Sequence, residues 1–179
     1  MAPLDIQIHD PHWRTELGED VDEVAQRVLR ACAKHLPQWQ DFPPDQQKVL
    51  GVSLALVDDA NIHKLNREFR GKDKPTNVLS FPAYKSVQEL RETLDLAPED
   101  VLEELASLGD ILIAYQTVAR EADEQGKSLY DHFCHLLAHG WLHLWGYDHM
   151  NDEDARIMEA LEIAILAELS IANPYADDI

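Results

Sequence analysis

This sequence is poor in long apolar runs, in cysteine and in basic residues. No apolar run approaches the roughly 20 residues that a membrane-spanning helix requires. The first ten residues, MAPLDIQIHD, are acidic and do not follow the basic and then apolar layout of a secretory signal peptide. We therefore expect a cytoplasmic protein without a membrane partner. A length of 179 residues fits one core, so residues 1–179 are expected to form a single domain.

Cysteine is also scarce, with two residues in the whole chain. Cys32 and Cys134 each fall within a helical apolar pattern, and an intracellular chain seldom keeps a disulfide. Both are therefore predicted to be buried thiols. Neither has a second cysteine at metal-binding spacing, so a zinc site built from cysteines is not expected.

Basic residues are few, with 15 Lys and Arg against 34 Asp and Glu and a formal net charge of −19. Proteins that bind nucleic acid usually carry a basic face, so the net charge alone argues against such a partner. The distribution of charge matters more than its sum. One short segment is rich in basic residues, namely Lys64, Arg67, Arg70, Lys72 and Lys74. A local cationic patch of this kind could still hold a polyanion.

Hydrophobic periodicity predicts four strands and about five helices. The strands are expected at residues 4–9, 49–58, 78–83 and 109–116. Helices are expected over 20–36, from Asp58 or Asp59 through Phe69, and after the fourth strand to about Glu124. Two more are expected from Ser128 to about Trp145 and over 151–169. Residues 84–107 form a polar, acidic excursion with helical turns. This mixed order indicates an α+β fold with a mixed four-stranded sheet.

Two details of these elements can be checked directly. Pro82 cannot donate a ladder hydrogen bond, so it should lie near a strand end or at a sheet edge. In the helix that follows Asp58, the helical period predicts that Ile62, Leu65 and Phe69 face inward.

The segment 131–145 predicts a helix with histidines along the border of its apolar face. The apolar stripe contains Phe133, Leu136, Leu137, Gly140 and Leu144, and the neighbouring stripe contains His132, His135, His139 and His143. His139 and His143 are four residues apart, so their rings lie side by side on adjacent turns. Both imidazoles could bind one cation at the roughly 2.0–2.1 Å of a zinc–nitrogen bond.

A third histidine follows directly after the predicted end of this helix. Gly146 is placed to terminate the helix, and Tyr147 and Asp148 lead the chain back to His149. The resulting pattern, H-x-x-x-H-x-x-G-x-x-H in HGWLHLWGYDH, has the zinc spacing of the metzincin proteases. Those enzymes carry a glutamate general base beside the first histidine, where this chain has Gly140. The spacing therefore predicts a metal site on a central helix without the base of a protease.

The ligand set favours hydrolytic chemistry. Three neutral imidazoles leave a zinc ion its full positive charge, and a water bound to it becomes a nucleophile near neutral pH. A structural zinc site would close all four positions, and Asp148 or His135 could supply a fourth ligand. His132 and His135 are more often supporting or surface residues than ligands. Trp141 and Trp145 could stack on nucleobases, although packing against neighbouring helices is the simpler reading.

Three segments together resemble the signatures of a known family. HGWLHLWGYDH (139–149), LNREFRGKDKPTNVLSFP (65–82) and LGDILI (108–113) resemble, in the same order, motifs of the YbeY family of bacterial single-strand-specific endoribonucleases. The resemblance implies a zincin-like α+β fold and one Zn²⁺ ion bound by His139, His143 and His149. It also implies two roles, maturation of the 3′ end of 16S ribosomal RNA and ribosome quality control. The implied substrate is single-stranded RNA.

The resemblance further implies that Arg70 is essential and that His139 belongs to the catalytic centre. A guanidinium matches the charge that develops on the non-bridging oxygens of a phosphodiester. Arg70 could instead be a solvated loop residue or part of a structural ion pair. Lys72 and Lys74 could extend a phosphate track. Proteins of the small ribosomal subunit are further possible partners.

Several roles stay open at this point. Thr76, Asn77 and Ser80 are expected to serve as turn and strand-capping groups more than as ligands. Asp110 could orient a histidine or could be an ordinary polar strand residue. The general base could be Asp148, a second metal-bound water or the 2′-hydroxyl of the substrate.

Two rival functions also remain. The chain could be a metallohydrolase that acts on another substrate class, although the absence of glutamate at position 140 counts against a peptidase. It could also be a non-enzymatic ribosome-assembly module that uses zinc only for stability.

Overall fold

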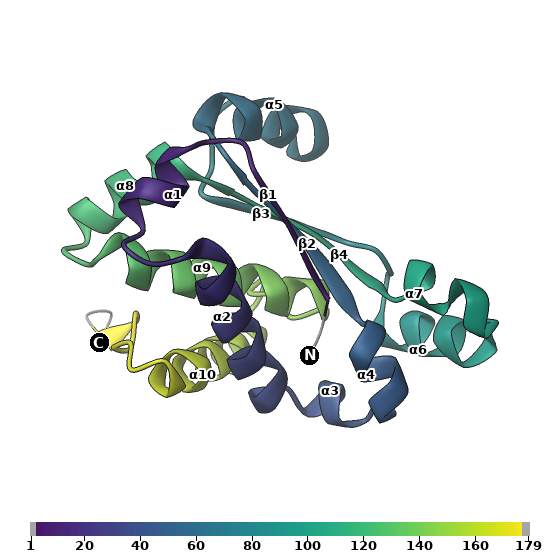
Figure 1. Cartoon of the computed structure of the whole chain (residues 1–179). Helices are drawn as coiled ribbons and strands as arrows, with labels where there is room; N and C mark the ends of the chain where they lie inside the picture. The colour runs from purple at the N-terminus through teal and green to yellow at the C-terminus, as the bar shows by residue number, and fades with distance from the viewer. Residues whose placement is uncertain (1–2, 177–179) are drawn as a thin grey trace.

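The computed structural model describes residues 3–176, and its centre is a mixed sheet of four strands in the order β1-β2-β4-β3 (Figure 1). Strands β1, β2 and β4 are parallel, whereas β3 pairs antiparallel with β4 at one edge. Their bounds are β1 (Leu4–Ile8), β2 (Gly51–Val57), β3 (Val78–Pro82) and β4 (Ser107–Ala114). The predicted mixed sheet is confirmed, with every strand end within two residues of its expected place. Pro82 ends the edge strand, as predicted.

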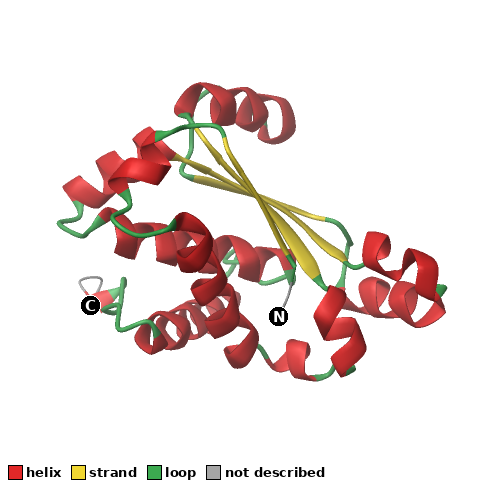
Figure 2. Ribbon diagram, in the orientation of Figure 1, coloured by secondary structure: helices red, strands yellow, loops and turns green. Residues whose placement is uncertain are grey.

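The prediction of about five helices is too low, because residues 3–176 contain ten α-helices and one 3₁₀ helix (Figure 2). The long ones are α2 (Val21–His35), α5 (Asp59–Arg70), α6 (Val87–Leu96), α8 (Tyr115–Glu124), α9 (Leu129–Leu144) and α10 (Asp152–Glu168). The short ones are α1 (His12–Glu16), α3 (Pro37–Gln40), α4 (Pro44–Val49), η1 (Glu99–Val101) and α7 (Leu102–Leu105). Helices of this length contain too few turns to show a hydrophobic period. Pro37 and Pro44 occupy the first turns of α3 and α4, where the missing N–H of proline costs no hydrogen bond within the helix.

The two faces of the sheet are covered to different extents. Alternation along β4 directs Ile111 and Ile113 into the large core formed with α2, α9 and α10, whereas Leu112 points toward α5. In Figure 1, α9, α2 and α10 lie on one side of the sheet, and α5 lies alone across the other side. The core under α5 is a small cluster of Val57, Ile62, Leu79 and Ala114. Part of this second face therefore remains open.

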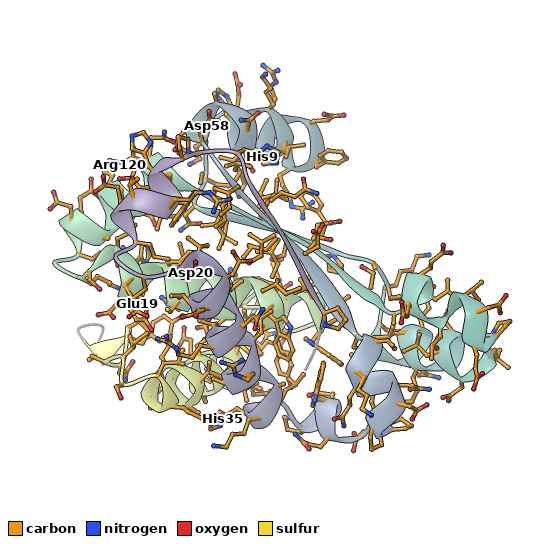
Figure 3. All side chains as sticks on the ribbon, in the orientation of Figure 1. His9, Glu19, Asp20, His35, Asp58 and Arg120 are labelled. Carbon is orange, nitrogen blue, oxygen red and sulfur yellow. The ribbon has the colours of Figure 1, made fainter. Side chains whose placement is uncertain are left out.

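Side-chain caps fix where the long helices begin. Asp20 accepts a hydrogen bond from the backbone N–H of Glu23, and Asp58 accepts one from Asn61, at the starts of α2 and α5 (Figure 3). Ser128 caps α9 in the same way, with its Oγ 3.0 Å from the N–H of Asp131. The predicted start of the histidine-bearing helix is thus confirmed.

Helix α9 is the central helix of the large core. Trp141 and Trp145 are almost fully buried and pack in an aromatic cluster with Trp39 and Phe42, so these rings are not available to nucleobases. Cys134 on α9 is a buried thiol, as predicted, and burial raises its pKa to about 12. Within residues 3–176, every helix is too short or too polar to cross a membrane.

Candidate metal centre and its cleft

The three predicted histidines meet at the C-terminal end of α9. His139 and His143 lie one turn apart, and their Nε2 atoms are 3.0 Å from each other. The chain then reverses at Gly146, which has a φ of +89° that favours glycine. The N–H of Gly146 donates to His143 O, and the N–H of Tyr147 donates to Leu142 O, the pattern of a Schellman motif. This turn brings His149 back to the other two rings.

The geometry of the triad fits a small metal ion. One ring nitrogen from each of His139, His143 and His149 lies within 4.8 Å of the others. Three nitrogens around one tetrahedral zinc ion are separated by about 3.4 Å, as follows from bonds of about 2.05 Å. The cluster therefore needs only small side-chain adjustments to hold an ion.

The hydrogen bonds of the two helical histidines also favour a cation. His143 Nδ1 is 2.8 Å from the carbonyl oxygen of Tyr147, and His139 Nδ1 contacts a carboxylate oxygen of Glu162. Both partners accept, so both Nδ1 atoms must donate. In the neutral rings, each Nε2 then carries an unshared electron pair, and the two pairs face each other. A cation between them turns this repulsion into two bonds.

Glu162 on α10 anchors the triad from inside the core. Its side chain is fully buried and contacts His139 through one oxygen and the hydroxyl of Tyr175 through the other. His135 Nε2 is 3.2 Å from the same hydroxyl. Burial raises the pKa of Glu162, but interactions with His135, His139 and Tyr175 outweigh it and hold the pKa at about 2. Glu162 is thus a buried anion behind His139.

The surroundings of His143 favour its neutral form. Burial lowers its pKa, and the proximity of His139 lowers it further, whereas the hydrogen bond to Tyr147 opposes this change. A neutral imidazole is the form that binds a metal, so the local electrostatics suit a ligand. His135, His139 and Glu162 form a second group whose ligand atoms lie close together, but here His139 Nδ1 is used in the hydrogen bond to Glu162.

Gly140 is explained by close packing between α9 and the sheet. A Cβ atom at this position would lie 3.0 Å from Ile111 Cγ2 and 3.0 Å from Ser80 Oγ. Ser80 Oγ also donates a 3.0 Å hydrogen bond to the carbonyl oxygen of Gly140. Position 140 therefore faces β3 and β4 and has no room for a glutamate. This agrees with the sequence argument that the base of a protease is missing.

The triad opens into a cleft of about 640 Å³ between α9 and the segment that follows α5. Three basic residues line this cleft with the histidines, namely Arg70, Lys72 and Lys74. Lys64 and Arg67, the other members of the basic cluster, do not line it. Three of the five residues of the basic cluster therefore line the same cleft as the histidines.

The guanidinium of Arg70 is held by the backbone of its own neighbourhood. Its Nη2 donates to Ser80 O at 2.9 Å, and its Nη1 donates to Phe69 O at 3.3 Å. Its Cζ lies 4.9 Å from the ring centroid of Phe81. Neither of its hydrogen-bond acceptors is a carboxylate, so the structure gives no support to the alternative of a structural ion pair. The positive charge is available to the cleft.

The remaining polar candidates serve mainly as scaffold. Asn77 Oδ1 accepts from the N–H of Val78, and its Nδ2 donates to Glu121, which in turn contacts the buried His132 at 2.7 Å. Asn77 thus ties the cleft wall to α8 and α9, as expected for a turn and strand-capping group. Thr76 and Tyr147 line the cleft.

Two acidic residues differ in their placement. Asp148 lies in the cleft, and its Oδ1 accepts from the N–H of His149 at 2.7 Å. Asp110 is exposed on the face of the sheet that α5 partly covers, away from α9, so the suggestion that it orients a histidine finds no support. Glu162 occupies that supporting position instead. Neither Glu162 nor Tyr175 was singled out from the sequence, since nothing local places their side chains behind His139.

Fold and site together define an α+β protein with a histidine cluster that could hold a metal ion in a cleft with basic residues. A family model described as endoribonuclease YbeY matches residues 7–170. An endoribonuclease YbeY of Rhizobium etli is 49% identical over 98% of this chain and 95% of its own length. Another, of Sphingopyxis alaskensis, is 52% identical over 74% of this chain and 76% of its own length.

The chain therefore belongs to the endoribonuclease YbeY family, a family of RNA-cleaving hydrolases. Among solved structures, the protein TM1509 of Thermotoga maritima resembles it with a TM-score of 0.50 and 23% identity, over 93% of this chain and 91% of the other. This likeness concerns the fold alone.

Proposed function

We propose that this chain is a zinc-dependent endoribonuclease specific for single-stranded RNA. It acts in the cytoplasm on the 3′ end of 16S ribosomal RNA and in ribosome quality control, with small-subunit proteins as partners. Family membership supports RNA cleavage. The observation that carries the proposal is that Arg70 and the three histidines line one cleft.

In this proposal, His139, His143 and His149 hold one zinc ion in a zincin-like arrangement, with both helical ligands on α9. Imidazole nitrogens in a tetrahedral set of three, with one open position, are typical of catalytic zinc. When bound, zinc supplies a Lewis acid that polarises a phosphoryl oxygen and makes a coordinated water more acidic. Glu162 and the carbonyl oxygen of Tyr147 orient the rings of His139 and His143 through their Nδ1–H groups.

Arg70 stabilises the negative charge that develops on the phosphate during cleavage. Its guanidinium is already fixed by Ser80 O and the ring of Phe81, so little ordering is required when the substrate binds. Lys72 and Lys74 bind neighbouring phosphates of the strand as exposed point charges. These three residues allow an acidic protein to hold a polyanion at one place.

Asp148 is the candidate for the general base. Among the described residues that line the cleft, it is the sole carboxylate, and it adjoins the ligand His149. Asp148 is about half exposed, so a proton that it takes from the attacking group can pass to solvent. An Asp148→Asn variant should lose most of the cleavage rate. The alternative is attack by the 2′-hydroxyl of the substrate. It would be supported if Asp148→Asn keeps the cleavage rate and if an RNA with a 2′-deoxy nucleotide at the cleavage site is not cut.

A cleavage assay tests the proposal. The purified protein should cut a single-stranded RNA and leave the matching duplex intact, and Arg70→Ala should lower kcat by about 100-fold or more. Arg14→Ala is the matched control, because Arg14 is an exposed arginine on α1 and does not line the cleft. Equal losses in the two variants would contradict the role of Arg70. A zinc-loaded wild type without RNA cleavage would favour the non-enzymatic assembly module, and hydrolysis of another substrate class would favour the other rival.

A further inference from the structure

A second pocket lies on the opposite face of the sheet from the histidines. It has a volume of about 330 Å³ and is bounded by the C-terminal half of α5 and by strands β1 to β4. The size is at the lower end of the range typical of small-molecule sites. This is the part of the sheet that α5 leaves open. None of the metal ligands lines this pocket.

Two phenylalanines form the aromatic wall of the pocket. Phe69 was predicted to face inward, but 55% of its surface is exposed, because α5 covers only part of this face. Phe69 meets Phe81 edge to face, with ring centroids 5.4 Å apart and an interplanar angle of 73°. A large exposed ring beside a pocket offers a flat apolar surface to a planar ligand.

The charged groups of the pocket favour a ligand that donates hydrogen bonds. Asp5 and Asp110 are exposed there, and no lysine or arginine is among the described lining residues. Ionised carboxylates only accept hydrogen bonds, so the pocket repels phosphate and attracts N–H groups. Asp110 lies directly opposite Phe81 in the pairing of β3 with β4. An acceptor thus sits beside the aromatic wall.

Arg70 joins this pocket to the cleft across the edge of the sheet. Ser80 and Phe81 are neighbours on β3, so their side chains point to opposite faces. Ser80 contacts α9 and lines the cleft, whereas Phe81 lines the pocket. The guanidinium of Arg70 touches both residues, through Ser80 O and the ring of Phe81. A strand bound to Arg70 in the cleft can therefore pass over β3 and reach the pocket.

We infer that this pocket binds a nucleobase of the RNA substrate, one that carries an exocyclic amino group. The base stacks on Phe69, and the amino group donates to Asp110, while a neighbouring phosphate of the same strand stays with Arg70. Single-stranded RNA is commonly recognised by this combination of aromatic stacking and hydrogen bonds to base edges. A paired base cannot enter, so the pocket also gives a reason for preferring single strands. The inference rests on the proposed function, which supplies RNA as the ligand.

The test is a binding titration that does not depend on cleavage. Fluorescence anisotropy is measured with labelled oligocytidylate and oligouridylate of equal length, and RNA integrity is checked on a gel. Cytosine has an amino group where uracil has a carbonyl oxygen, so this pair isolates the acceptor role of Asp110. The variants are Phe69→Ala, Asp110→Asn and, as matched control, Leu96→Ala, another exposed apolar side chain, on α6 and outside the pocket.

The expected pattern has three parts. Phe69→Ala raises Kd for both oligonucleotides about tenfold, the scale of one stacked base. Asp110→Asn removes the preference of the wild type for cytidylate, and Leu96→Ala changes nothing. Because Phe69 and Asp110 are exposed, the variants should fold, and circular dichroism checks this.

Other results overturn the inference. The first is equal RNA affinity of Phe69→Ala and Leu96→Ala, and the second is a wild type that shows no preference for cytidylate or does not bind RNA at all. The third is a lysine-rich peptide whose binding depends on Phe69, when the binding of RNA does not depend on Phe69. Cleavage is scored separately. RNA cleavage by the wild type, together with RNA binding that is independent of Phe69, rejects the pocket and leaves the proposed function standing. RNA binding that depends on Phe69, without any RNA cleavage, supports the pocket and rejects the proposed function.

Discussion

Glu162→Gln provides a sharp test of how the histidine cluster is held. Glutamine has nearly the same shape as glutamate, and its carbonyl oxygen can still accept from His139 Nδ1 while its amide faces the hydroxyl of Tyr175. The substitution therefore removes one negative charge and leaves the packing of α10 against α9 in place. Zinc affinity should fall, because the buried anion no longer strengthens the donor power of His139.

The expected magnitude follows from the contacts of Glu162. Its pKa of about 2 makes it an anion throughout the neutral range, so its hydrogen bond with His139 is charge-assisted. Such bonds contribute about 1.5–3 kcal/mol, against about 1 kcal/mol for a neutral pair. The difference of about 0.5–2 kcal/mol corresponds to a loss of roughly 2- to 30-fold in zinc affinity, since 1.4 kcal/mol is a factor of about ten. Losses of 10–100-fold are typical of such supporting residues.

The assay is a competition titration of metal-free protein with zinc and a chromogenic chelator, with thermal unfolding measured in parallel. Glu168→Gln is the matched control on the same helix, because Glu168 pairs at the surface with Lys34 and His35. Zinc affinity of the control should equal that of the wild type. If folded Glu162→Gln also binds zinc as tightly as the wild type, the argument that Glu162 supports His139 is refuted.

Three further predictions concern packing, pH and phosphate contacts. Gly140→Ala should lower the free energy of unfolding by about 1 kcal/mol or more, measured with urea, since the new Cβ crowds β3 and β4; an unchanged midpoint would contradict the close approach of α9. Burial raises the pKa of Glu121, but hydrogen bonds from His132 and Asn77 outweigh burial and lower the pKa from its ordinary value of 4.5. The stability that the ionised carboxylate gives the fold is therefore present above a pH of about 4.5 and is lost as the pH falls through the lowered pKa. The stability difference between wild type and Glu121→Gln should therefore shrink from pH 6 toward pH 3, and a constant difference would refute this sign. Replacing both Lys72 and Lys74 with Gln should weaken RNA binding and reduce the slope of log affinity against log salt by about 0.7 per lysine; an unchanged slope would remove them from the phosphate track.

The histidine cluster could be predicted because it depends on local geometry. The four-residue spacing of His139 and His143 fixes their common face once the helix is assumed, and Gly146 supplies the only reversal that the third histidine needs. The same holds for the four strands, whose alternation is strong enough to give their ends within two residues. In both cases, the signal lies within about ten consecutive residues.

Features that depend on tertiary packing could not be predicted. Glu162 reaches His139 because α10 packs against α9, and a glutamate in an amphipathic helix gives no local sign of complete burial. Phe69 has the helical phase of an inward residue, yet α5 covers too little of the sheet to bury it. Asp110 follows a strand pattern that leaves open which face it occupies. The placement of all three residues is set by how α5, α9 and α10 pack on the sheet.

A stoichiometric zinc titration tests the central claim most directly. Metal-free protein receives zinc in fractions of one equivalent, and the cleavage rate of a single-stranded RNA is measured after each addition. We predict a linear rise that ends at about one zinc per chain, with no rise for His143→Ala, which keeps Arg70 and the rest of the cleft. Full cleavage by the metal-free protein, or an equal rate for His143→Ala, would contradict the proposal that three histidines hold the ion that cleavage requires.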